Sequence, residues 1–140
     1  MTTGPTELAT AYARAWAAHD ADAIVALHTE DSVFHVHGLG AAASGVASVR
    51  LLVVAFLRHV PDLHVDRKRV HLGTDHLVTE YDMSGTAGGS PFVCDGVDVI
   101  AVSNGLVARK DTYLDLAALQ RQTSPLPVMT IQPPGTSGPH

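Results

Sequence analysis

Asp98 is the residue of this sequence whose type and neighbours point most clearly to chemistry. It stands in the run GVDVIAVS among apolar residues, where a carboxylate is unusual unless it has a partner. The longer run GVDVIAVSNGLVARKDTYLD predicts two strands joined by a turn. A three-residue loop would place Asp98 opposite Lys110, and a two-residue loop would place it opposite Asp111. We favour the first arrangement, which brings Asp98, Lys110 and Thr112 together on one sheet face, as an ion pair or as a functional group.

A second candidate is the pair His35 and His37, which alternate along the predicted strand 32–38. Histidine transfers protons near neutral pH, and an HxH pair is also compatible with part of a metal site. The sequence places no third His, Cys or carboxylate beside the pair, so we predict no metal site. It contains no GxGxxG or P-loop motif, and we predict no cofactor.

Length and charge restrict the class of protein. The chain has 140 residues, and its net charge of −5 includes only nine Lys and Arg. The length fits a single domain, and the charge argues against a nucleic-acid partner. The apolar runs are too short and too charged to cross a bilayer, and the first residues lack the pattern of a signal peptide. We therefore expect a cytoplasmic protein with no nucleic-acid partner and no membrane partner.

The elements that must position these side chains are helices first and strands afterwards. A first helix follows Thr6, a candidate cap, and carries Tyr12 and Trp16 one turn apart; Asp20 can cap the next helix. The further predicted helices are 21–28, 46–59 and 115–122, and the predicted strands are 32–38, 63–72, 76–85, 91–103 and 106–114. This order predicts an α+β fold with helices on one face of a mostly antiparallel sheet.

Two segments interrupt or end this pattern. The glycine-rich run GTAGGSP lies between the predicted strands 76–85 and 91–103, and we predict that it is a mobile link. Residues 1–122 form the predicted domain, and residues 123–140, rich in Pro, Ser and Gly, form a tail. The tail is either a flexible end or an arm that packs through Val128, Met129 and Ile131.

The strand 91–103 is apolar on both faces. Val97 and Val99 point to one face, and Cys94 and Ile100 point to the other. A strand of this kind must be covered on both sides. The helices provide one cover, and we predict that a second copy of the chain provides the other in a homodimer.

Four stretches together identify a fold: YARAWAAHDADAIVALHTEDSVFHVHG, PDLHV, TEYDMSGT and GVDVIAVSNGLVARKDTYLDLAALQRQ. Their order and content resemble the NTF2-like superfamily, specifically its SnoaL-like polyketide cyclase and ketosteroid isomerase branch. The resemblance implies a curved sheet that forms a cone around the N-terminal helices, with a pocket at the wide end. It implies no single activity, because this fold carries isomerases, cyclases, hydrolases and proteins without chemistry.

The resemblance also implies roles for individual residues. Tyr12 matches a tyrosine of the ketosteroid isomerases, and Asp98 matches an acid that stays protonated in an apolar pocket. Together they would donate hydrogen bonds to a substrate carbonyl oxygen as it gains negative charge. The family's general base corresponds to Val36, so the flanking His35 and His37 are the candidates that move the proton.

Other branches of the family suggest further residues. In the cyclases, an acid near the end of the last strand is the catalyst, and Asp111 and Asp115 lie there; Asp115 is equally a candidate helix cap. The limonene epoxide hydrolases use an acid–Arg–acid set. The corresponding Glu80, Asp82 and Thr112 lack its arginine, which argues against epoxide opening. Glu80 and Asp82 face either the pocket or solvent.

These residues predict a cofactor-independent acid/base enzyme that acts on a small, apolar, carbonyl-containing molecule, as an isomerase, cyclase or hydratase. The predicted catalytic residues are Asp98, Tyr12, His37, His35 and Asp115. The predicted substrate-binding residues are Trp16, Phe34, Glu80, Asp82, Phe92, Lys110, Thr112 and Leu114. The alternative is a non-catalytic module that binds a small ligand or serves dimerisation.

Overall fold

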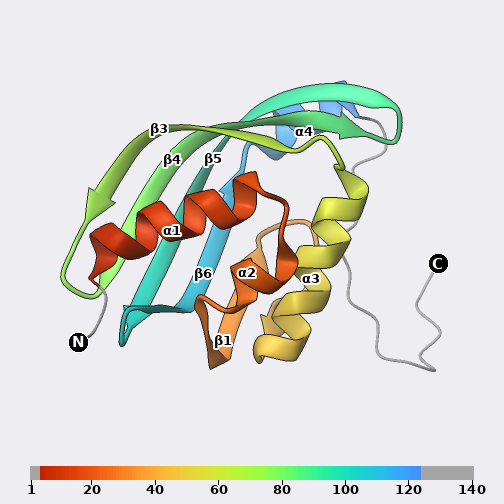
Figure 1. Cartoon of the computed structure of the whole chain (residues 1–140). Coiled ribbons are helices and arrows are strands. Elements are labelled where there is room, and N and C mark those ends of the chain that lie inside the picture. Colours follow the sequence, from red (N-terminus) through yellow and green to blue (C-terminus); the bar gives the residue numbers. More distant parts are fainter. Residues whose placement is uncertain (1–3, 124–140) are drawn as a thin grey trace.

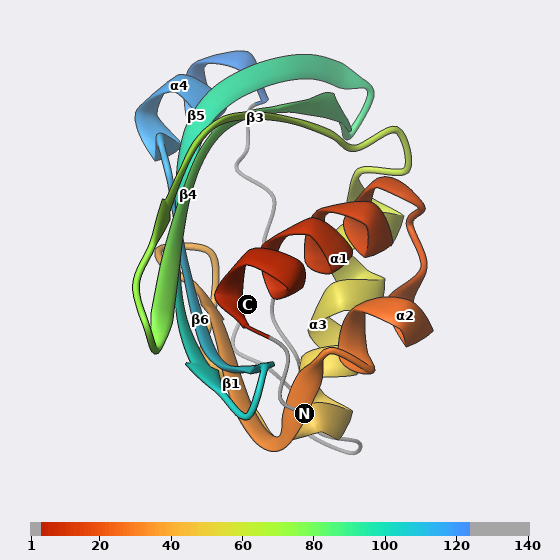
Figure 2. The ribbon, with the colours of Figure 1, turned by 60° about the vertical axis from the view of Figure 1, so that its left-hand side comes forward.

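The computed structural model describes residues 4–123 as a curved, unclosed six-stranded sheet with helices in its concave face (Figures 1 and 2). The helices are α1 (Pro5–Ala17), α2 (Ala21–Val25), α3 (Val46–His59) and α4 (Leu116–Gln122). The strands are β1 (His28–Val36), β2 (Ala43–Ser44), β3 (His64–Leu72), β4 (His76–Ala87), β5 (Ser90–Ser103) and β6 (Leu106–Leu114). The predicted α+β class is confirmed. The predicted tail lies outside the described residues from position 124 onward.

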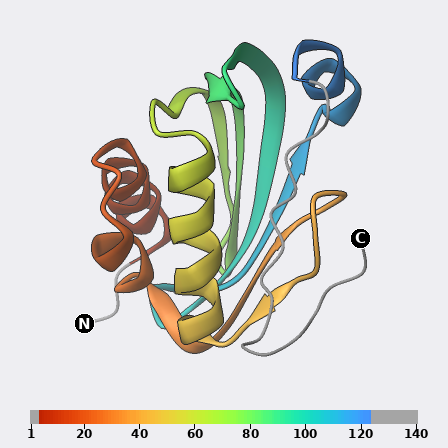
Figure 3. The ribbon, with the colours of Figure 1, turned by 90° about the vertical axis from the view of Figure 1, so that its right-hand side faces the viewer.

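The strand order is β2-β1-β6-β5-β4-β3, and all neighbours are antiparallel except β1 and β6. The mostly antiparallel character of the sheet is therefore confirmed. Helices α1 and α3 lie against the concave face, and α4 lies at the far end of β6 (Figure 3). The core between these layers is formed by apolar side chains from both, among them Leu8, Ile24, Phe34, Leu52 and Leu77.

The first two helices begin and end differently from the prediction. Gly4, not Thr6, is the N-cap of α1, because Pro5 already occupies the first helical position, where its missing N–H costs nothing. Asp20 caps α2 as predicted, accepting a hydrogen bond from the backbone N–H of Ala23 (3.0 Å). Helix α2 does not extend to His28, because that residue enters the sheet beside β6.

The glycine-rich run GTAGGSP is an ordered hairpin and not an open link. Strand β4 continues to Ala87, which pairs with Ser90, and Gly88 and Gly89 form the turn between them. Both glycines have positive φ angles (57° and 82°), which other residues adopt only with strain. The glycines therefore allow the two strands to stay paired through this region.

The turn between β5 and β6 has a register that neither prediction included. Asn104 and Gly105, both with positive φ, form a two-residue turn. One extra residue in β6, Ala108, then shifts the pairing by one position. As a result Asp98 lies opposite Thr112, and not opposite Lys110 or Asp111.

Within residues 4–123, none of the helices is long and apolar enough to span a membrane.

Candidate active site

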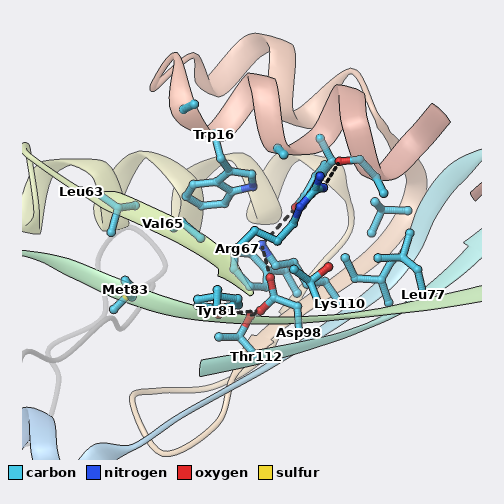
Figure 4. Close-up of a pocket in the computed structure, with 18 of the residues that line it drawn as sticks. Trp16, Leu63, Val65, Arg67, Leu77, Tyr81, Met83, Asp98, Lys110 and Thr112 are labelled. Atoms are coloured by element: carbon cyan, nitrogen blue, oxygen red, sulfur yellow. Dashed lines mark hydrogen bonds and ion pairs between the residues drawn. The ribbon is translucent and has the colours of Figure 1, made fainter. Parts of the chain in front are cut away.

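A cavity of about 200 Å³ lies between α1 and the concave face of the sheet (Figure 4). Most of its wall is apolar, and its polar groups come from β4, β5 and β6, from the α1 side chains Tyr12 and Trp16, and from β3. Its exposed edge is formed by β3 through His64, Val65 and Arg67. The rest of the lining consists of Leu8, Ala9, Tyr12, Ala13, Trp16, Ala17, Phe34, Phe56, Leu63, Leu77, Thr79, Tyr81, Met83, Asp98, Ile100, Val107, Lys110 and Thr112.

Helix α1 contributes the aromatic side chains Tyr12 and Trp16. Residues four apart lie on the same face of a helix, and the two rings meet edge to face with centroids 6.4 Å apart. Trp16 also packs edge to face against Phe34 (6.4 Å) and Phe56 (6.0 Å). These contacts fix the indole and make it a rigid wall of the cavity.

The carboxyl group of Asp98 is surrounded by donors. The hydroxyls of Tyr81 and Thr112 donate to Oδ1 at 2.8 and 2.6 Å, and Lys110 Nζ lies 3.6 Å from Oδ2. The Lys110 ammonium can only donate, so a proton on Oδ2 would face another donor, whereas a carboxylate accepts from all three groups. The geometry therefore favours an ionised Asp98 over the protonated donor that the family resemblance implies.

Tyr81 reaches Asp98 because residue 96 is glycine. Tyr81 pairs with Gly96 across β4 and β5, and its ring lies over the bare backbone there. A Cβ at position 96 would lie 2.6 Å from Tyr81 Cε1 and 2.9 Å from Leu114 Cδ2, closer than side chains pack. Gly96 thus makes room for the ring whose hydroxyl holds Asp98 in place.

Lys110 is a buried cation, with only 6% of its side chain exposed. Its ammonium lies 4.4 to 4.8 Å from the ring centroids of Trp16, Phe34 and Tyr12, within range of cation–π attraction. Burial, the largest single influence, lowers the pKa of Lys110, but Asp98 and Tyr12 together outweigh it and the net pKa is raised. Lys110 therefore keeps its positive charge inside the protein.

A chain of hydrogen bonds continues from Lys110 to β1. Lys110 Nζ donates to the Tyr12 hydroxyl (3.3 Å), which lies 2.9 Å from His28 Nε2. Lys110 can only donate, so the Tyr12 hydroxyl accepts from it and keeps its own proton for a donation to His28 Nε2, an arrangement in which His28 Nδ1 donates to Ser32 Oγ (3.3 Å). Burial, together with the charge of Lys110, lowers the pKa of His28 to about 3, so this imidazole is neutral. In this arrangement the Tyr12 proton is held by His28 and does not point to a ligand.

The indole N–H of Trp16 is the exception in this satisfied network. Trp16 Nε1 is buried, and although the Tyr12 hydroxyl is near it, it forms no hydrogen bond of good geometry among residues 4–123. A buried donor without a partner costs about 1–3 kcal/mol. Trp16 lines the cavity beside Lys110, so an acceptor atom of a ligand in the cavity is the partner that would remove this cost.

The structure brings together one part of the predicted set. Tyr12, Trp16, Phe34, Asp98, Lys110 and Thr112 all line the cavity. Asp98, Lys110 and Thr112 share one face, as the first of the two turn predictions required, although the register differs.

His35 and His37 do not reach the cavity. Phe34 and Val36 face the core from β1, so the alternate residues His35 and His37 face the outer side of the sheet. There His37 Nε2 lies 2.8 Å from Asp111 Oδ1. Partial burial raises the pKa of Asp111, but Arg109 and His37 outweigh it and hold the pKa below its usual value.

The other predicted residues lie outside the cavity as well. Glu80 binds Arg69 and His71, and Asp82 binds Lys68, all on the outer face. Asp115 caps α4, accepting from the backbone N–H of Ala118 (3.1 Å). Phe92 and Leu114 pack in or against the core and do not line the cavity.

Three residues of the site were missed by sequence reasoning. Tyr81 stands between Glu80 and Asp82, which drew attention as charged residues, yet it alternates with Thr79 and Met83 on the pocket side. His28 was assigned to a helix. Arg67 lies at the open edge, where its guanidinium reaches the carbonyl of Ala9 (3.5 Å). The alternation of side chains along β4 was the one sequence signal that could have identified a missed residue, Tyr81.

A family model for the SnoaL-like domain matches residues 9–110. None of the curated protein sequences matches the chain.

Solved structures of the same fold give the wider context. A hypothetical protein from Catenulispora acidiphila with a ketosteroid isomerase-like fold, solved with trimethylamine, is 24% identical with a TM-score of 0.78, covering 89% of this chain and 96% of that one. A candidate polyketide cyclase from Sinorhizobium meliloti is 21% identical with a TM-score of 0.65, covering 76% and 93%. An LEH-like epoxide hydrolase from M. tuberculosis is 18% identical with a TM-score of 0.71, covering 82% and 85%. At these identities the likeness establishes the fold.

Proposed function

The chain belongs to the SnoaL-like domain family, and we propose that it is a cofactor-independent acid/base enzyme that acts on a small, apolar ketone or related carbonyl compound. In this proposal the carboxylate of Asp98 is the base. Lys110 and the indole N–H of Trp16 hold the carbonyl oxygen. Tyr12, Tyr81 and Thr112 position these groups and do not exchange protons with the substrate.

The observation that carries the proposal is the pairing of a buried carboxylate with unused donor capacity in one apolar cavity. Within the part of the chain that the structure describes, the one polar contact of Asp98 Oδ2 is with Lys110 Nζ (3.6 Å), which leaves it able to accept a proton. Trp16 Nε1 has no partner among the described residues 4–123. A carbonyl compound needs these two functions side by side, a base for the proton next to the carbonyl and a donor for the oxygen.

Charge and volume support a neutral and compact substrate. Lys110 and Asp98 balance each other, so the buried lining among residues 4–123 has no charge left for an ionic ligand to neutralise, and the further cation Arg67 lies at the exposed edge. An apolar cavity of about 150 Å³ is known to accept benzene, and this one measures about 200 Å³. A monocyclic ketone therefore fits inside, and a larger skeleton would extend past Arg67. A relative of this fold holds trimethylamine, which supports a small ligand.

The proposed step needs no redox partner. Asp98 Oδ2 takes a proton from the carbon next to the carbonyl. The electron pair of that C–H bond forms a C=C bond, and the carbonyl π pair moves to the oxygen, where Lys110 and Trp16 stabilise the negative charge. Return of the proton to another carbon gives an isomer, and attack of the enolate on a second carbonyl gives a cyclised product.

Nuclear magnetic resonance and mass spectrometry on one sample test this function. Trp16 is the only tryptophan, so its indole N–H gives a single resonance. We expect cyclohexenone or a methyl-substituted relative, added in D₂O-containing buffer, to shift this resonance downfield and to gain deuterium next to its carbonyl. Cyclohexene should do neither. Trp16→Phe should weaken ketone binding about fivefold, the value of one hydrogen bond.

The competing proposal is a protein that binds a small ligand without transforming it. The observation in its favour is that most polar groups of the site already bind other residues of the chain. It predicts a shift of the Trp16 resonance with no deuterium in any ketone of the panel. That result would reject the catalytic proposal and keep the binding site.

We also propose a homodimer formed through the outer face of the sheet. Val97 pairs with Tyr113 there, and Val99 and Tyr113 are 42% and 45% exposed. Apolar side chains clustered on an exposed sheet face are typical of an interface. Analytical ultracentrifugation should give twice the chain mass for the wild-type protein, and the chain mass for Val99→Lys. A monomeric wild-type protein at micromolar concentration contradicts this assembly.

A further inference from the structure

We propose that His35, His37 and Asp111 form a binding site for a divalent transition-metal ion such as zinc on the outer face of the sheet. Each residue offers one ligand atom, and these atoms lie within 4.8 Å of one another. The site is separate from the cavity, because it occupies the opposite face of β1 and β6. It therefore stands independently of the proposed function.

The two strands create this cluster through their alternation and register. His35 and His37 are two apart on β1 and share a face, and their ring centroids are 3.8 Å apart. Asp111 is the direct partner of His35 in the parallel pairing of β1 and β6. The third ligand that the sequence did not place beside the HxH pair thus comes from a strand 74 positions further along the chain.

The ligand types fit zinc better than magnesium or calcium. Two imidazole nitrogens and one carboxylate oxygen are a common set for zinc with one position left to water, whereas magnesium and calcium prefer oxygen ligands. Zinc–ligand bonds of 2.0–2.1 Å require ligand atoms about 3.3 Å apart. The separation between His37 Nε2 and Asp111 Oδ1, 2.8 Å, is shorter than this value, and the 4.8 Å limit for the whole cluster is longer. Rotation of the side chains is therefore sufficient to bring the three ligand atoms to the spacing that zinc requires.

Groups around the cluster already orient the ligands. His35 Nε2 lies 3.2 Å from the carbonyl of Gly40, which can only accept, so Nε2 carries the proton and Nδ1 keeps its lone pair for a metal. A hydrogen bond from the second ring nitrogen to a carbonyl is usual for metal-binding histidines. The ring of His37 is stacked on Tyr113 at 4.2 Å and 9°. These contacts reduce the entropy lost when a metal binds.

Arg109 competes with a metal for the same carboxylate. Its guanidinium donates to both oxygens of Asp111, at 2.8 and 3.1 Å. A metal ion must share Asp111 with this cation or displace it. Removing the guanidinium should therefore strengthen metal binding at this site. Metal bound adventitiously by a surface histidine would show no such gain.

Isothermal titration of the full chain with ZnCl₂ tests the site. We expect one zinc ion per chain, whether or not two chains pair, and no uptake of magnesium at the same concentration. His37→Ala and Asp111→Asn should each weaken binding at least about tenfold, and Arg109→Gln should strengthen it severalfold. Circular dichroism of each variant checks that it is folded.

His71→Ala is the matched control. Like His37, His71 contacts a carboxylate that an arginine also binds; here the carboxylate is Glu80 and the arginine is Arg69. In the described part of the chain, no second imidazole joins a ligand cluster at His71. This variant should bind zinc as the wild-type chain does. Three results would overturn the proposal: no zinc uptake, equal losses in His71→Ala and His37→Ala, or no gain in Arg109→Gln.

Discussion

Replacement of Lys110 by methionine is expected to lower the free energy of unfolding by about 3 kcal/mol, measured by urea denaturation. Methionine fills similar volume but leaves Asp98 as an unpaired charge, and breaking a buried ion pair from one side costs about 3–5 kcal/mol. We expect the lower end, because Tyr81 and Thr112 still donate to Asp98. The variant also loses the attraction between the ammonium and three aromatic rings.

Two further variants separate this cause from a simple packing defect. Adding Asp98→Asn to Lys110→Met removes the unpaired charge and should restore more than half of the lost stability. Lys68→Met is the matched control, because Lys68 pairs with Asp66 and Asp82 but is half exposed. The urea midpoint of this variant should barely differ from that of the wild-type chain. A double variant no more stable than Lys110→Met would show that the ion pair is not the source of the loss.

The elements of this fold could be predicted from the sequence because their patterns are local. Helix α3 and strand β6 have the predicted bounds, and the remaining long strands differ from them by a few residues. Alternation and turn residues act over short distances. The failure at His28 follows from the same fact: it joins the sheet by pairing with Val107, a partner far along the chain.

The candidate site was predicted in part, and its errors have physical causes. Asp98, Lys110 and Thr112 were expected on one face because strand alternation survives a shift in register. Their contacts were not predictable, since they depend on the extra residue Ala108 in β6. The tightest partner of Asp98 besides Thr112 is Tyr81, whose approach requires Gly96 opposite it.

The charge state of Asp98 is the most consequential difference. An acid among valines suggests a protonated group, because burial opposes charge. Lys110 is more deeply buried than Asp98 and opposes that effect from the neighbouring strand. Both residues are visible in the sequence, but only the three-dimensional contacts decide whether Asp98 is a hydrogen-bond donor or a base.

Asp98→Asn is expected to reduce proton exchange at the ketone by at least about a hundredfold, the lower range for loss of a general base. Asparagine keeps the shape of aspartate and an oxygen for Tyr81 and Thr112, but it leaves Lys110 without its counter-ion and costs some stability. Circular dichroism and the ketone-dependent shift of the Trp16 resonance should show that the variant remains folded and binds the ketone under the conditions of the assay. Asp66→Asn, at an exposed carboxylate on β3, controls for a general change in charge and should exchange as the wild-type chain does.

The rate of deuterium incorporation into a bound ketone, compared between the wild-type chain and Asp98→Asn, is the most direct measurement of the central claim. We predict incorporation by the wild-type chain and the uncatalysed rate for the variant, although both bind the ketone. Equal incorporation by the two proteins would contradict the assignment of Asp98 as the base.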